Sequence, residues 1–217
     1  MFYRDRAEAG RRLAQALLPY ADEHPIILAL PRGGVPVAAE VAAALHAPLD
    51  LVLVRKIGVP GQEELAMGAV VDGSAPLIVR NEDIIHLTNT TEDAFAAVCN
   101  RECAEIERRR QRYVGTRARA NVAQRVAIVI DDGIATGASA RAALQALRLL
   151  HPKILVLAVP VGAAETIEML KADADAIICI EKPEVLGSIS ACYADFRQIT
   201  DDEVIAILER FPASSVR

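Results

Sequence analysis

Residues 126–140 read VAIVIDDGIATGASA. Five apolar residues lead into two adjacent carboxylates, Asp131 and Asp132, and a run of Gly, Ala, Thr and Ser follows. A short, continuous apolar run predicts a strand that is buried on both faces of a sheet. The small residues predict a turn, and the pattern from Ala138 onwards predicts a helix. Two negative charges beside nearly bare backbone indicate a place for a ligand.

The same alternation of short apolar runs and amphipathic segments continues along the chain. Strands are predicted at 26–30, 50–54, 126–130, 154–159 and 176–180, with a hairpin of 68–71 and 76–79 around Asp72 and Gly73. Helices are predicted over 6–20, 36–45, 92–113, 138–150, 163–171 and 201–210. This order predicts an α/β fold with a mainly parallel, twisted sheet and helices on both of its faces. Such sheets bind ligands at the carboxyl ends of their strands.

Composition narrows the class of protein. With 217 residues, 53% hydrophobic and 24% charged, the chain predicts one globular domain over 1–217. A net charge of -5 argues against nucleic acid as a partner. No apolar run reaches the roughly 18 residues of a membrane span, and the amphipathic start of the chain does not resemble a cleavable signal. The cysteines lack CxxC spacing, so we expect reduced cysteines in a cytoplasmic protein: Cys99, Cys103, Cys179 and Cys192.

The turn after the acidic pair has the chemistry of an anion site. Successive backbone N–H groups and the positive end of the following helix form a cradle for an anion. Small side chains let a phosphate approach the backbone closely, and Thr136 and Ser139 add hydroxyl donors. The carboxylates suit a metal or a neighbouring group rich in hydroxyls. A ligand with a phosphate at one end and a diol beside it is a ribose 5-phosphate.

Other readings of this segment are weaker. A nucleotide site of the P-loop kind would need GxxxxGK[ST], which the sequence lacks. A nucleophile elbow GxSxG fails because Arg141 stands where the last glycine should be. A receiver-like acidic pocket would need a third aspartate at the end of another strand, and no good candidate exists. A polar turn without any function is the remaining alternative.

The stretch VIDDGIATGAS resembles the phosphoribosyl-diphosphate (PRPP) signature of type I phosphoribosyltransferases. The resemblance implies the fold of that family, with a small variable hood over the acceptor, and Mg²⁺ bound mainly through ligand oxygens and water. It also implies that Asp131 and Asp132 hold the ribose 2- and 3-hydroxyls. The 5-phosphate would lie on the loop of Ala135, Thr136, Gly137, Ala138 and Ser139.

A second segment, ILALPRGGVPVAAEVA (27–42), supports this resemblance. It places Arg32, Gly33 and Gly34 directly after the first predicted strand. Alone, RGG is as consistent with a generic turn. Beside the first motif, it resembles the pyrophosphate loop of the family, where amides and a basic side chain hold the leaving group. The guanidinium fork of Arg32 matches phosphate oxygens. The family also has a cis peptide here, which predicts a cis Pro31–Arg32 bond.

A third segment, VRKIGVPGQEELAMGAV (54–70), carries Arg55 and Lys56 at the end of the second predicted strand. Residues 57–67 show little periodicity and few apolar anchors, which predicts a mobile loop. The resemblance implies that this loop closes over the pyrophosphate, with Arg55 and Lys56 beside it. The alternative for these two side chains is a solvated strand end.

The arginine-rich stretch 101–119 suggests a nucleic-acid surface at first sight. Its glutamates stand at helical spacings from the arginines, so a salt-bridged, exposed helix is the better interpretation. Packing between subunits would also suit such a helix, and we expect a homo-oligomer, most simply a dimer.

The acceptor is harder to predict. Relatives that act on 6-oxopurines carry an aspartate where this chain has Ala135, which argues against hypoxanthine and guanine, although PRGG resembles the xanthine–guanine branch. The hood is expected from 181–200 together with the N-terminal residues. Tyr193 or Phe196 would stack on a base there, or would form the core of the hood instead.

These features predict an enzyme that transfers ribose 5-phosphate from PRPP to a nitrogenous base or related acceptor and releases pyrophosphate. A PRPP- or nucleotide-binding regulator without turnover is the alternative from another class. A hydrolase that uses the same pocket is a third.

Overall fold

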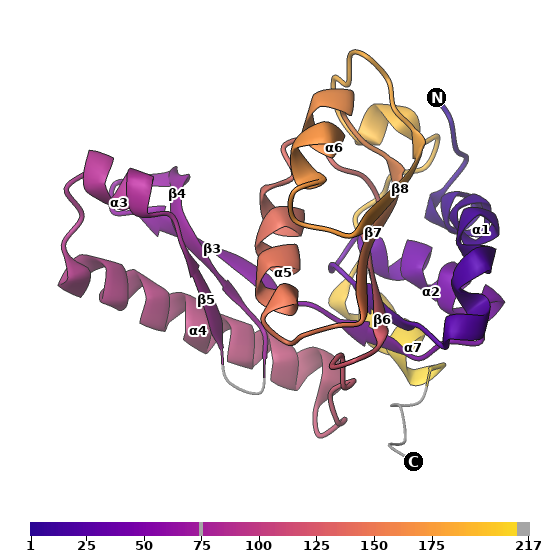
Figure 1. Cartoon of the computed structure of the whole chain (residues 1–217), viewed down its shortest axis with the longest axis horizontal. Coiled ribbons are helices and arrows are strands. Elements are labelled where there is room, and N and C mark those ends of the chain that lie inside the picture. The colour runs from indigo at the N-terminus through magenta and orange to yellow at the C-terminus, as the bar shows by residue number, and fades with distance from the viewer. Residues whose placement is uncertain (74–75, 212–217) are drawn as a thin grey trace.

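The computed structural model describes residues 1–73 and 76–211. Its centre is a five-stranded, fully parallel sheet with the strand order β2-β1-β6-β7-β8 (Figure 1). The strands are β1 (Ile26–Ala29), β2 (Leu49–Leu51), β6 (Val126–Ile130), β7 (Ile154–Val161) and β8 (Ala176–Glu181). The predicted parallel α/β sheet is therefore confirmed, and β6 ends directly before the acidic pair.

Helices cover both faces of this sheet, as predicted (Figure 1). One face packs against α1 (Arg6–Leu17), α2 (Gly34–Ala44) and α7 (Asp201–Glu209), and the other against α5 (Ala138–Arg148) and α6 (Ala164–Leu170). Neighbouring residues of β6 show the alternation behind this layering. Ile128 lies in the first core and Val129 in the second, because successive side chains of a strand point to opposite faces. A strand buried twice must be apolar throughout, which explains the continuous run VAIVI.

A second, antiparallel sheet projects from the main body as an arm (Figure 1). It consists of β3 (Val54–Val59), β4 (Gln62–Val71) and β5 (Leu77–Arg80), followed by α3 (Glu82–Leu87) and the long α4 (Glu92–Val114). Strand β4 pairs with β5 in the register Val70 to Ile78, which confirms the predicted hairpin pairing. Residues 74–75 of its connection lie outside the described residues. Two short 3-10 helices, Leu18–Glu23 and Ser190–Cys192, complete the elements.

The structure corrects two predictions in this region. The strand predicted at 50–54 is divided between β2 and β3, because the chain leaves the main sheet there and enters the arm. The segment 57–67, predicted to be a mobile loop, forms the β3–β4 hairpin, which turns at Pro60 and Gly61. Its closure over the pyrophosphate stays a prediction. Gly61 has a φ of +79°, a conformation that glycine adopts readily. The hairpin has apolar anchors beyond those expected, because Ile57 and Met67 are fully buried.

Within the described residues, no helix has both the length and the apolar character needed to cross a membrane. The four cysteines are free thiols.

If 57–67 is a packed hairpin, Met67→Ala should lower the free energy of unfolding by about 2–5 kcal/mol, the range for a large-to-small change in a core. Chemical denaturation measures this loss. Exposed Gln62→Ala, in the same hairpin, should change the free energy by less than about 0.5 kcal/mol. Rapid amide exchange across 57–67 in the unliganded wild type would instead support the mobile loop.

Candidate functional site

The loops after β1 and β6 meet at the carboxyl edge of the main sheet. The Leu30 N–H donates to the Ile130 carbonyl at 2.9 Å, which holds the end of one strand against the other. A Cβ at Gly34 would lie 2.6 Å from that same carbonyl oxygen. The predicted pyrophosphate loop and the predicted acidic pair are therefore neighbours, although about 100 residues of sequence separate them.

Gly33 is needed for a close approach as well. A Cβ at this position would lie 2.1 Å from Oδ2 of Asp132, well inside a van der Waals contact. A side chain here would push the loop away from the acidic pair, so the glycine permits contact that no other residue allows. The Pro31–Arg32 peptide is cis, as predicted. Arg32 follows at the surface, 3.6 Å from a carboxylate oxygen of Asp201.

Asp131 lines a small cavity of about 90 Å³ together with Arg55 and Ser139. One of its carboxylate oxygens accepts a hydrogen bond of 2.9 Å from the Asp132 N–H. Burial raises the pKa of Asp131 well above its usual range, and the neighbouring Asp132 carboxylate adds to this shift. Asp131 is therefore a carboxylate that gains from a cationic or hydrogen-bonding ligand.

Asp132 has a protein partner of its own. The Arg6 Nε lies 2.7 Å from Asp132 Oδ2, and both side chains are nearly buried. The Arg6 guanidinium also donates to the Arg197 carbonyl at 2.9 Å and lies over the Phe196 ring at 3.8 Å from its centroid. Burial raises the pKa of Asp132, while the ion pair with Arg6 opposes that shift. Arg6 is a site residue that sequence reasoning missed.

The N-terminal residues and the segment after β8 pack together over this pair. Tyr3 forms a β-bridge with Tyr193, and the Tyr193 hydroxyl donates to the Asp132 carbonyl at 2.5 Å. Tyr193 is 3% exposed, with the rings of Tyr3 and Phe196 at 5.4 and 5.1 Å. The predicted stacking of a base on Tyr193 is therefore wrong for this structure, because other rings cover its faces. The Arg6 guanidinium covers one face of the Phe196 ring. Tyr193 and Phe196 therefore both pack inside the hood that the N-terminal residues and the segment after β8 form.

The loop predicted to hold the 5-phosphate leads into α5. Gly137 is the N-cap with a φ of +73°, and a Cβ there would lie 2.7 Å from Thr166 Cγ2. Thr166 also donates to the Ala135 carbonyl at 2.7 Å, so α6 supports the loop from behind. Ala135, Thr136, Ala138 and Ser139 are exposed, which leaves room at the positive end of an 11-residue helix.

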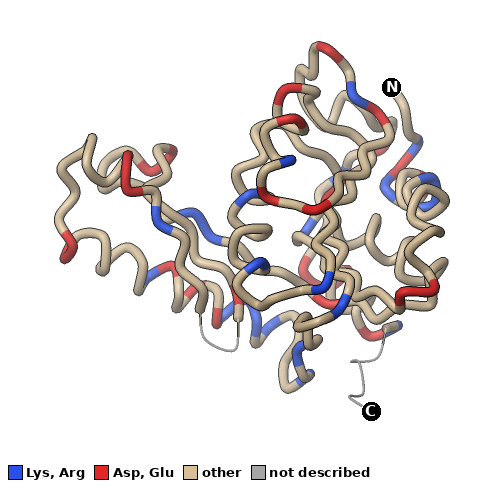
Figure 2. Tube along the Cα trace, in the orientation of Figure 1, with Lys and Arg blue, Asp and Glu red and all other residues tan. Residues whose placement is uncertain are grey.

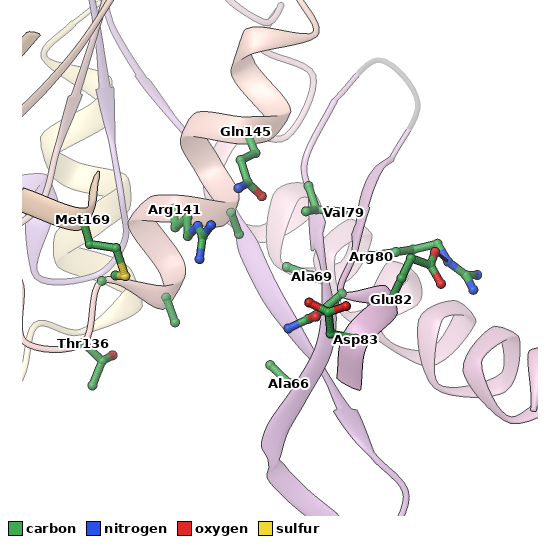
Figure 3. Close-up of a pocket in the computed structure, with 15 residues that line it drawn as sticks. Ala66, Ala69, Val79, Arg80, Glu82, Asp83, Thr136, Arg141, Gln145 and Met169 are labelled. Atoms are coloured by element: carbon green, nitrogen blue, oxygen red, sulfur yellow. Dashed lines mark hydrogen bonds and ion pairs between the residues drawn. The ribbon is translucent and has the colours of Figure 1, made fainter. Parts of the chain in front are cut away.

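A larger cavity of about 550 Å³ begins at this loop and runs between α5 and the arm (Figure 3). Arg141 and Gln145 of α5 line one side, and Val79 and Arg80 of β5 lie on the other. Thr136, a residue of the loop predicted to hold the 5-phosphate, lies at one end of the cavity. The loop is thus open towards a polar cleft.

Arg55 and Lys56 have different surroundings. Arg55 reaches the Asp131 cavity, where buried Glu102 of α4 holds its guanidinium at 2.7 Å. Lys56 pairs with Glu64 across the hairpin at 2.9 Å and does not line that cavity. Neighbouring residues of a strand point to opposite sides, which explains the separation. The structure brings Arg55 to the site and corrects the expectation for Lys56.

Residues 1–73 and 76–211 contain no group of three or more acidic, histidine or cysteine side chains that could hold a metal. Of the described residues that line the small cavity, Asp131 alone carries a carboxylate. One carboxylate together with phosphate oxygens and water is how proteins commonly bind Mg²⁺ with a phosphorylated ligand. The donor set therefore suits Mg²⁺ that is brought by a ligand.

Asp131→Asn should stabilise the ligand-free protein at neutral pH. The raised pKa means that ionised Asp131 opposes folding, and this penalty grows as the pH rises through its native pKa. We expect an increase in Tm of roughly a few degrees at pH 8 that fades towards pH 4, measured by thermal unfolding. Exposed Asp22→Asn is the matched control and should leave Tm unchanged. A less stable Asp131→Asn protein at pH 8 would contradict the assignment.

Arg6→Met should be strongly destabilising, because it leaves the Asp132 charge buried without its partner. Loss of one member of such a pair costs about 3–5 kcal/mol. Arg6→Lys should lose less, since it keeps the charge but not the planar contact with Phe196. Denaturation at pH 8 and pH 5 measures both, with a smaller loss at pH 5 as Asp132 takes up a proton. Arg11→Met, exposed on the same helix, is the control, and equal losses for Arg6→Met and Arg11→Met would refute the role of the pair.

Comparison with known proteins identifies the family to which this chain belongs. A family model described as "Phosphoribosyl transferase domain" matches residues 3–197. "Putative phosphoribosyl transferase MT0597" and "Putative phosphoribosyl transferase Rv0571c", from two strains of Mycobacterium tuberculosis, are each 43% identical over 206 residues. These matches cover 95% of this chain and 46% of each relative, so the chain spans about half of their length.

The solved structures extend the likeness to three dimensions. The crystal structure of TT1426 from Thermus thermophilus matches with a TM-score of 0.87 and 39% identity, and the match covers 98% of this chain and 100% of that one. The family model covers the main sheet, the arm and the acidic pair together. This chain is therefore a member of the phosphoribosyl transferase domain family, and its fold is a parallel α/β sheet flanked by helices with a small antiparallel sheet.

Proposed function

We propose that this protein binds PRPP and transfers its ribose 5-phosphate to a nitrogenous base or related acceptor, with release of pyrophosphate. The observation that carries the proposal is the meeting of three groups at one sheet edge. These are the exposed loop at the start of α5, the half-buried Asp131 and the loop with Arg32. A phosphate, a diol and a diphosphate are the three parts of PRPP, and each has a chemically suited partner here.

In the proposed reaction a nitrogen lone pair of the acceptor forms a bond to C1 of the ribose. The bond from C1 to the pyrophosphate oxygen breaks, and its electron pair leaves with pyrophosphate. Charge in the transition state is positive on the ribose ring and negative on the leaving group. The amides of 135–139 orient the sugar through its 5-phosphate, and Arg32 meets the growing negative charge. Asp131 lies near the ribose ring, where positive charge develops. Because the protein forms no covalent bond to the substrate in this step, positioning supplies most of the catalysis.

Asp131 and Asp132 have different tasks in this proposal. Asp131 lines the small cavity and takes the ribose hydroxyls directly. Asp132 shares the contact through the part of its carboxylate outside the ion pair with Arg6. Arg6 is then a positioning residue that links the hood to the sugar site. We include residues 1–5 and 192–197 in this hood, which would cover the acceptor.

Mg²⁺ is the expected cofactor. Asp131 and the oxygens of PRPP would hold the ion together with water. When bound, Mg²⁺ neutralises charge on the pyrophosphate as that group leaves. The other residues act without it, since Arg32 and Arg55 already place positive charge at the same edge.

The direct experiment measures pyrophosphate release from PRPP and Mg²⁺ in the presence and absence of a panel of purines, pyrimidines and related bases. Acceptor-dependent release identifies a transferase and its substrate. Release that needs no base indicates a hydrolase, and PRPP binding without release indicates a regulator; either result would overturn the proposed transfer.

Asp131→Asn should weaken PRPP binding by about tenfold or more, the effect of losing a charge-assisted hydrogen bond. Isothermal titration with Mg²⁺ present measures this change. Asp22→Asn again serves as the control, because its side chain is exposed in the 3-10 helix after α1. Unchanged affinity of the Asp131→Asn protein would exclude this carboxylate from the sugar site.

A further inference from the structure

Arginines from two separate segments surround a cavity of about 150 Å³ beside the pyrophosphate loop. Its lining residues are Arg32, Arg108, Arg109, Arg112, Tyr113 and Asp201. All but Arg32 and Asp201 come from the last turns of α4, where basic residues gather among acidic ones in Figure 2. Four guanidinium groups around one small cavity stand out in a chain whose net charge is -5.

The carboxylates near this cavity are shared between the arginines. Glu105 pairs with Arg108 at 2.8 Å and with Arg109 at 2.7 Å. Asp201 lies 3.6 Å from Arg32 and 3.1 Å from Arg112. Arg112 also lies 3.8 Å from the exposed Asp202 carboxylate. In the described part of the chain, these contacts of Arg32 and Arg112 are ion pairs and not well-aligned hydrogen bonds. Their N–H groups are therefore available to a further acceptor.

Asp201 occupies the place that a bound anion would take. Its carboxylate accepts a hydrogen bond of 2.7 Å from the Tyr113 hydroxyl and is the nearest negative group to Arg32 and Arg112. Asp201 is the first residue of α7, so its position follows that helix and not α4. The hydrogen bond from Tyr113 and the nearby arginines lower the pKa of Asp201. Burial raises the pKa of Tyr113 to about 12, so its hydroxyl keeps its proton and donates.

We propose that this cavity is a second anion site, which shares Arg32 and Arg109 with the neighbouring PRPP site and takes a phosphate or diphosphate group in place of the Asp201 carboxylate. A guanidinium fork matches phosphate oxygens, and several such groups from different elements bind one phosphate in a fixed orientation. The Tyr113 hydroxyl would transfer its hydrogen bond from Asp201 to the anion. A doubly charged phosphate gains more from four arginines than a single carboxylate does.

The site goes beyond the proposed transfer reaction but adjoins it. Arg109 lines both this cavity and the small cavity of Asp131, and Arg32 belongs to the pyrophosphate loop. An anion bound here would therefore change the charge beside PRPP, and would release Arg32 from Asp201. A free phosphate anion in this cavity would therefore alter the binding of PRPP in the neighbouring site.

The test is isothermal titration of the full chain with inorganic phosphate and, separately, with pyrophosphate, at low ionic strength. Each titration is run alone and with saturating PRPP and Mg²⁺. With PRPP and Mg²⁺ present we expect one anion to bind, held by Arg108, Arg112 and Tyr113, which do not line the Asp131 cavity. Without PRPP, the phosphate and pyrophosphate subsites of the PRPP site are free to bind the same anions as well. Binding that disappears when PRPP is present would place the anion in the PRPP site and overturn the proposal. If PRPP itself does not bind, the proposed function fails, while the titrations without PRPP still test the arginine site.

Two variants give opposite expected signs. Arg112→Gln should weaken anion binding by about tenfold or more through loss of a charged donor. Asp201→Asn removes the internal competitor and should strengthen binding several-fold, which a general structural defect would not do. Arg148→Gln is the matched control, because Arg148 on α5 is similarly exposed and paired with Asp175 at 2.9 Å. It should leave anion binding unchanged.

The sign of the Asp201→Asn effect decides the matter. Weaker or unchanged anion binding in a folded Asp201→Asn protein, shown by an unaltered circular dichroism spectrum, would overturn the displacement of Asp201. Equal losses in Arg112→Gln and Arg148→Gln would reduce the effect to general surface charge.

Discussion

The partial burial of two adjacent carboxylates at the end of β6 is the constraint on which the rest of the site depends. A buried charge is costly unless it has partners, and two neighbouring charges repel each other. The fold meets this constraint unequally. Asp132 pairs with Arg6 at 2.7 Å, whereas among the described residues Asp131 accepts one backbone hydrogen bond and opens into a small cavity. That inequality leaves one carboxylate in need of a ligand, which is what a binding site requires.

The N-terminal and C-terminal parts of the domain are organised around this ion pair. Arg6 comes from the first turn of α1, lies against Phe196 and donates to the Arg197 carbonyl, so that it ties two distant segments to β6. Tyr193 adds a hydrogen bond to the backbone of Asp132 itself. The hood over the acidic pair is thus held in place by the same groups that offset the charge of Asp132. A change in that charge would alter the hydrogen bonds and packing of the hood.

The contrast between β6 and Arg6 explains what could be predicted from the sequence. A strand buried on both faces needs a continuous apolar run, so VAIVI identified β6 and, with its equivalents, the parallel sheet. Arg6 acts 126 residues away from its partner. Helical spacing places Arg6 on the buried stripe of α1 and Arg11 and Arg12 off it, which is a local signal, but nothing in the sequence identifies Asp132 as the partner. The hairpin at 57–67 did carry a signal, because Pro60 and Gly61 stand between apolar residues at alternate positions. Its two glycines and polar stretch obscured that alternation.

The same reasoning applies to the arginines of α4. Sequence spacing correctly indicated a helix with salt bridges, and Glu105 with Arg108 and Arg109 forms them. What spacing could not show is that α4 passes beside the loop of Arg32 and the start of α7, since only the tertiary fold brings these elements together. Charges that balance along α4 do not balance in space, because Arg32 joins them from another segment. Arg32 and Arg112 then share the single carboxylate of Asp201. Both the acidic pair and the arginine cavity therefore arise where the ends of strands and helices meet. The first carries excess negative charge and the second excess positive charge, and a ligand of opposite sign would neutralise either.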